Sequence, residues 1–139
     1  MFFNKKKETE EKNFHFIKIA ALLIHAAKID EKYSNEEEEI IKKTLIDLGV
    51  NQNELDSLMA NAKKDEENAN QILDFTREIK SLDESNKIKI IKSLWKIIYS
   101  NKDADIYETN LMRRLTGLLY IDSKVMGDIK EKIKNENAS

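Results

Sequence analysis

The sequence predicts an all-α fold of about seven helices in one compact domain. The chain has 139 residues, no proline and three glycines, so little in it interrupts a helix. Lysine, glutamate, isoleucine and leucine are abundant, which is typical of helical proteins. Apolar residues recur every three or four positions through most of the chain, which is the spacing of one helix face. No segment convincingly predicts a strand.

The first strongly apolar segment, residues 14–27, is apolar around most of its circumference. A helix of this kind is buried on several sides, so we expect a central helix over residues 14–28. The segment contains a lysine and two histidines and is shorter than the roughly 20 residues that cross a bilayer, so we expect a soluble protein without a transmembrane segment. Residues 1–12 are charged and aperiodic, which predicts a flexible tail before a single domain at 13–136.

Two further helices are predicted in the first half of the chain. Ser34 precedes Glu37 by three positions, which is the spacing of a capping box, and apolar residues follow at helical intervals. Gly49 is a natural end for this helix. Asn51 opens a third helix. Residues 61–70 are too polar for the core, so we expect a loop or a frayed helix end there.

The second half predicts four more helices. A short helix covers about residues 71–80, and a long apolar segment over 83–100 begins at a capping aspartate. This segment carries two apolar stripes, so we expect it to be the second central helix, with Trp95 in the core. A sixth helix follows Asp105, and the last helix starts at Asp122.

The two halves of the chain correspond when one is shifted by 71 residues. Ser34 then falls on Asp105 and Glu37 falls on Glu108, so predicted caps meet predicted caps. In both halves an apolar helix, a short acidic loop and a capped helix follow in the same order. We expect an internal pseudo-repeat around the two central helices, and convergence of two ordinary helical hairpins is the alternative.

Charge and composition exclude several classes of function. The 24 basic and 26 acidic residues give a net charge of −2, whereas a dedicated nucleic-acid-binding domain has a clear basic excess. Without cysteine the chain has no disulfide, no thiol nucleophile and no cysteine zinc site. The sequence contains no glycine-rich phosphate loop and no HExxH motif. We therefore expect neither an enzyme nor a nucleic-acid partner.

Two acidic segments are the features that most suggest ligand binding. Residues 30–37 follow the first central helix, and residues 101–108 follow the second. Carboxylates in such a loop and in the first turn of the next helix can direct oxygens at one cation, and calcium and magnesium prefer oxygen ligands. Neither segment has the pattern of an EF-hand loop. The same carboxylates can simply cap helices, so both interpretations stay open.

The histidines and arginines suggest less. His15 and His25 lie on one predicted helix about 15 Å apart along its axis, which is too far to share a metal ion. For His25, near the end of a helix, the commoner role is a single structural hydrogen bond. Arg113 and Arg114 suit either an anion or an acidic partner, or packing over the core beside local carboxylates.

Over roughly residues 14–133 the chain resembles the TerB-like, tellurite-resistance-associated family. An apolar helix leads into Ala27-Lys28-Ile29-Asp30, which is similar to the Ala-Asp-Gly turn of that family. Tyr33 and Glu36-Glu37 then follow in the family's order. Three later stretches are also similar to the family: residues 73–77, 94–95 and 107–119.

The resemblance implies candidate ligands. If the acidic, metal-binding character of the family holds in this chain, a divalent cation such as calcium or magnesium is bound by Asp30 and Glu37, with Glu108 next. Glu31 stands where the family has the glycine of the first turn. Lys102 stands in the second turn, where its charge weakens a cation site by repulsion.

The resemblance also implies a bacterial, cytoplasmic module of tellurite or general stress resistance. Family members often act near the cytoplasmic face of the membrane, so peripheral membrane association is compatible with it. Our first hypothesis is a non-catalytic module in which a cation bridges the acidic loops and adjusts the binding of a protein partner. The alternative is a structural protein–protein adaptor without metal, in which the acidic residues only cap helices.

Overall fold

Seven helices make up the part of the chain that the structure describes. The computed structural model describes residues 2–29, 33–69, 71–100 and 106–138, and no strand occurs within these ranges. The predicted all-α architecture of about seven helices is confirmed. The helices are α1 (Phe2–Lys28), α2 (Asn35–Asp47), α3 (Gln52–Asn68), α4 (Leu73–Ile79), α5 (Glu84–Tyr99), α6 (Ile106–Leu118) and α7 (Ser123–Ala138).

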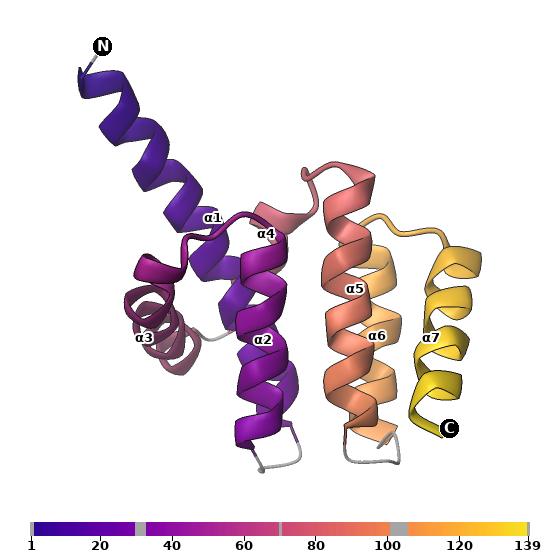
Figure 1. The fold of residues 1–139 in the computed structure, drawn as a ribbon. Coiled ribbons are helices and arrows are strands. Elements are labelled where there is room, and N and C mark those ends of the chain that lie inside the picture. The colour runs from indigo at the N-terminus through magenta and orange to yellow at the C-terminus, as the bar shows by residue number, and fades with distance from the viewer. Residues whose placement is uncertain (1, 30–32, 70, 101–105, 139) are drawn as a thin grey trace.

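The helices pack around α1 and α5. Figure 1 shows α2 and α5 side by side and antiparallel, with α7 on the other side of α5. α1 packs against α2, α3, α4 and α5, and its N-terminal turns extend beyond the rest of the fold (Figure 1). α1 and α5 end, and α2 and α6 begin, at the same end of the molecule, which is the lower end in Figure 1.

The two helices predicted to be central form the core. Every residue from 19 to 27 in α1 is buried except His25. In α5 nine of 16 residues are buried. Trp95 is 3% exposed, and its Nε1–H donates to the sulfur of Met126 at 3.3 Å, so its predicted core position is confirmed. α2 is joined to α5 by a buried hydrogen bond of 2.8 Å between the hydroxyls of Thr44 and Ser93.

Two polar segments differ from the prediction. α1 begins at Phe2, so it includes residues 2–12, for which we expected a tail. Lysine and glutamate favour helix without any apolar stripe, so a charged segment can extend a helix that is anchored further along the chain. The flexibility of that segment and the domain limits at 13–136 stay predictions. α3 continues to Asn68, so the expected loop or frayed end over 61–70 was wrong for most of its length. Ala62 is fully buried there, and polar neighbours pair with other helices.

Helix boundaries in the two halves match at the 71-residue offset. α2 and α6 both have 13 residues and start 71 positions apart. α1 and α5 end at Lys28 and Tyr99, and α3 and α7 begin at Gln52 and Ser123, which keeps the same offset. The pseudo-repeat itself stays a prediction, supported by these boundaries.

The ends of α2 and α6 share one backbone geometry. Gly49 follows α2 with a φ of 113°, and Tyr120 follows α6 with a φ of 56°. The next N–H returns to a carbonyl five residues earlier in each case, Val50 to Leu45 at 2.9 Å and Ile121 to Thr116 at 3.0 Å. This arrangement satisfies carbonyls that a helix end leaves open, and it stops the helix. Gly49 therefore ends α2 as predicted.

Candidate functional site

Glu37 is the predicted cation ligand that the structure describes most fully. It is 1% exposed in the first turn of α2. Its Oε1 accepts hydrogen bonds from the N–H of Ser34 at 2.9 Å and from the Ser34 hydroxyl at 3.0 Å. The Ser34 oxygen in turn accepts from the N–H of Glu37 at 3.1 Å. The predicted capping box is therefore present, and it fixes the carboxylate in place.

The other two predicted ligands are described less fully. Asp30 and the predicted cap Asp105 lie outside the described residues. Glu108 belongs to α6, but its side chain lies outside the description. Within the described ranges, no group of three or more His, Asp or Glu side chains is arranged to hold a metal ion. What the structure adds is that the acidic first turn of α2 and the start of α6 lie at the same end of the molecule (Figure 1).

A charged contact joins the start of α2 to α3. Lys63 Nζ lies 2.7 Å from Glu38 Oε1, and the Tyr33 hydroxyl donates to the same oxygen at 3.5 Å. The hydrogen bond from Lys63 lowers the pKa of Glu38. Burial, and then the nearby negative charge of Glu38, raise the pKa of Tyr33. Glu38 is therefore an ionised carboxylate with a structural partner.

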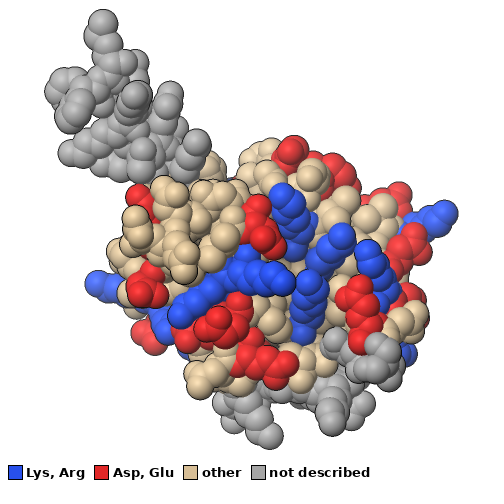
Figure 2. Space-filling view, in the orientation of Figure 1, with Lys and Arg blue, Asp and Glu red and all other residues tan. Residues whose placement is uncertain are grey.

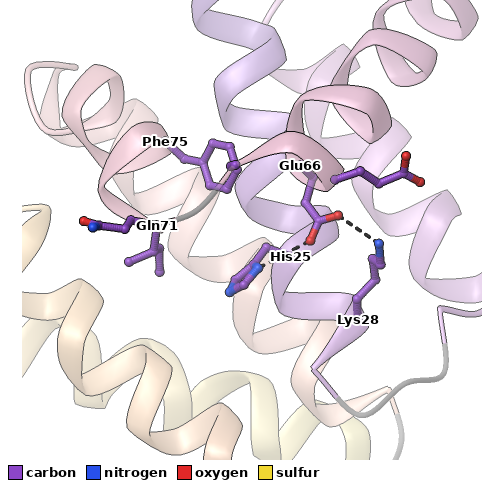
Figure 3. A pocket seen from close by; sticks show the side chains of 8 residues that line it. His25, Lys28, Glu66, Gln71 and Phe75 are labelled. Carbon is purple, nitrogen blue, oxygen red and sulfur yellow. Dashed lines mark hydrogen bonds and ion pairs between the residues drawn. The ribbon is translucent and has the colours of Figure 1, made fainter.

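A cleft of about 360 Å³ lies where the end of α1 meets α3 and α4. In Figure 3 the side chains of His25 and Lys28 point toward Glu66. Glu66 Oε2 accepts from Lys28 Nζ at 2.9 Å, and Glu66 Oε1 lies 3.4 Å from His25 Nδ1. The ring of Phe75 flanks His25, with ring centroids 6.5 Å apart. The remaining lining residues are Glu67, Ala69, Gln71 and Ile72.

A second hollow, of about 440 Å³, also has His25 in its lining. Asn110, Leu111 and Arg114 of α6 line it together with Ile29 and His25. Arg113 and Arg114 are both exposed. The two hollows therefore meet at His25 and present donor groups beside apolar surface, which suits recognition of a polar ligand or side chain.

The partner of His25 could not be found from the sequence. A single structural hydrogen bond was expected for His25, and the structure places its Nδ1 3.4 Å from Glu66 Oε1. Glu66 itself was missed because residues 61–70 were expected to form a loop or a frayed helix end. The available signal was the pattern of acids at Asp65 and Glu66 on an extended α3, opposite the basic side chains of α1. Lys18, for example, pairs with Asp65 at 2.8 Å.

Comparison with known proteins places the chain in a protein family. A family model described as tellurite resistance protein TerB matches residues 16–131. The matched region includes α1 from Phe16 onward, all of α5, the capped start of α2 and the cleft around His25. No curated protein and no solved structure matches the chain. None of the described helices is long and apolar enough to cross a membrane.

Proposed function

Because this chain belongs to the TerB family of tellurite resistance proteins, we propose that it is a non-catalytic, cytoplasmic module of a bacterial stress response. In this proposal it binds a divalent cation, calcium or magnesium, and acts through a protein partner. The observation that carries the proposal is the common position of two helix starts. α2 and α6 each follow an acidic segment, and both begin at the same end of the molecule (Figure 1).

The proposed ligands are Asp30 and Glu37, with Glu108 contributing less. Carboxylate oxygens are the ligands that hard cations prefer, and a fixed carboxylate loses less freedom when it binds. Glu37 is fixed by its cap. Capping and coordination are compatible, because an ionised carboxylate has two oxygens and about four acceptor positions. The site beside α6 is the weaker one, since Lys102 brings a positive charge to it.

The second candidate function is a protein–protein adaptor without a cation. The observation that favours it is the capping box itself, because three hydrogen bonds with Ser34 give Glu37 a structural role. In this alternative Glu37→Gln changes the melting temperature very little in any buffer, since glutamine can also form a capping box. Only the favourable interaction of the Glu37 charge with the helix dipole is lost, which is about 0.3–1 kcal/mol.

Thermal melting distinguishes the two candidates. The native protein, Glu37→Gln and Glu108→Gln are melted in chelator and in millimolar calcium or magnesium. Exposed Glu36 lies in the same turn as Glu37, so Glu36→Gln is the matched control. A cation that binds only the folded state raises the melting temperature by mass action.

For the cation proposal we expect a rise in the native protein and in the control. Glu37→Gln loses most of the rise while its melt in chelator is almost unchanged, and Glu108→Gln loses less. If the native melting temperature is the same in chelator and in every cation, the cation proposal fails and the adaptor stands.

A further inference from the structure

The charges of α5 are all of one sign beyond its first residue. After Glu84 this helix contains four lysines and no acidic residue. Lys87 is buried and donates to a carbonyl at the end of α6 at 2.9 Å. Lys89, Lys92 and Lys96 follow at intervals of three and four positions, so they lie along one helix face. Lys89 and Lys96 are exposed and Lys92 is half-buried, and these three form the lysine stripe.

The neighbouring helix α7 adds a basic group beside the stripe. Lys130 lies with its Nζ 5.4 Å from the ring centroid of Trp95, which directly precedes Lys96. Figure 2 shows the result: lysine and arginine side chains gather over α2 and α5 in the middle of this face, and acidic side chains lie mostly around them.

The stripe has no acidic partner among the described residues. Lys89 donates to the backbone carbonyl of Asp47 at 3.4 Å, and this is a neutral acceptor. Three lysines on other helices are paired with carboxylates from a distant part of the chain: Lys18 with Asp65, Lys28 with Glu66 and Lys63 with Glu38. With 26 acidic residues against 24 basic ones, a shortage of acids does not explain the difference.

From this segregation of charge we propose that the lysine stripe docks an acidic segment of a protein partner. Its ends are seven helical positions apart, so the stripe is roughly 10 Å long, which suits a short peptide segment. Acids such as Glu38 and Asp47 lie on the neighbouring helix. A long nucleic acid or an anionic membrane would also press against these acids, whereas a short acidic segment avoids them. The inference rests on the proposed function for the existence of a partner, and it requires no cation.

A peptide titration tests the inference. The probes are a labelled peptide of aspartate and glutamate alternating with alanine, its asparagine and glutamine counterpart, a DNA duplex and phosphatidylserine vesicles. The full chain is compared with a triple variant, Lys89→Gln, Lys92→Gln and Lys96→Gln. The matched control removes the same charge at three exposed lysines on other parts of the surface, Lys64→Gln, Lys80→Gln and Lys132→Gln.

We expect the native protein to bind the acidic peptide and not the neutral one, and we expect added salt to weaken binding. Loss of three charge contacts weakens binding by about tenfold or more in the stripe variant, and the control stays within about twofold of the native protein. Thermal melts of both variants show that they fold.

Three outcomes overturn the inference. They are no binding of the acidic peptide by the native protein, equal binding by the stripe variant, and equally tight, stripe-dependent binding of DNA or vesicles. Cation-dependent melting of the same variants separates this proposal from the previous one. Peptide binding that survives in a protein indifferent to cations removes the cation proposal alone.

Discussion

At the scale of single residues, α2 and α6 are each followed by a residue in the left-handed backbone conformation. Gly49 adopts its positive φ freely, because it has no side chain. Tyr120 adopts a positive φ with a large side chain, at a cost of roughly 1–2 kcal/mol. Tyr120 is 70% exposed, and its ring centroid lies 5.9 Å from the buried ammonium of Lys87. The same helix end is thus formed at two positions by residues of opposite steric character.

Gly49→Ala measures how much the left-handed conformation at this helix end matters for the free energy of unfolding. No atom lies within 4 Å of the added Cβ, so the substitution strains the backbone without a clash. We expect the free energy of unfolding to fall by about 1–2 kcal/mol in denaturant melts. Gly127→Ala is the matched control, since its Cβ also meets no atom but Gly127 lies inside α7. There we expect a gain of about 0.5–1 kcal/mol. A loss at both positions, or at neither, contradicts the account.

The contact between Lys63 and Glu38 makes a pH-dependent contribution. Because the folded pKa of Glu38 is lowered, this contribution is complete above the ordinary pKa of a glutamate and disappears as pH falls through the lowered value. Lys63→Gln should therefore destabilise the protein at pH 7 by at most about 1 kcal/mol, since the lysine is exposed. At a pH well below this lowered pKa, the variant and the native protein should unfold with equal free energy. If the two proteins still differ as much in free energy of unfolding in acid, Lys63 stabilises the protein through packing and not through its charge.

At the scale of elements, α3 is held to its neighbours by charged contacts as well as apolar ones. Leu55, Leu58 and Met59 are buried along its first half. Its second half, beyond Ala62, pairs with α1 through Asp65 and Glu66. Glu66 is the more buried of these two acids, with a side chain 10% exposed. A polar segment therefore remains helical because a neighbouring helix supplies its partners.

Glu66→Ala tests this explanation of α3. The variant removes the acceptor of both Lys28 and His25, and we expect it to lose about 1–2 kcal/mol of unfolding free energy. Glu67 is the next residue and is exposed, so Glu67→Ala is the control and should change stability by less than about 0.5 kcal/mol. Equal effects of the two variants would show that the ion pairs contribute nothing to the position of α3.

The contrast between α2 and α3 shows what the sequence can predict. The cap of α2 joins residues only three positions apart, so its spacing reveals it. The partner of Glu66 lies 38 residues away, so only the packed structure brings Lys28 to it. Apolar periodicity likewise predicted both central helices, since their burial follows from their own composition. Apolar periodicity did not predict a helix over residues 61–68, because this part of α3 is polar and its partners lie on a neighbouring helix.

At the scale of the whole molecule, the arrangement of the two halves determines where the candidate site lies. In each half a central helix is followed by a 13-residue helix, and α2 and α6 begin at the same end of the molecule (Figure 1). The sequence predicted the order of these helices, and the ligand types that it suggests stay a prediction. It could not predict that two helix starts 71 residues apart share one end, because that depends on the packing of α1, α2 and α5. The cleft around His25 and the lysine stripe likewise follow from packing.

Titration calorimetry tests the central claim, which is that the end where α2 and α6 begin binds a divalent cation. Calcium, magnesium, manganese and zinc are titrated into the native protein and into Asp30→Asn, Glu37→Gln and the control Glu36→Gln. The account predicts saturable binding of calcium or magnesium by the native protein and the control, and binding weaker by about tenfold or more in the other two variants. Absence of binding heat for all four cations, or native affinity in Glu37→Gln, would contradict it.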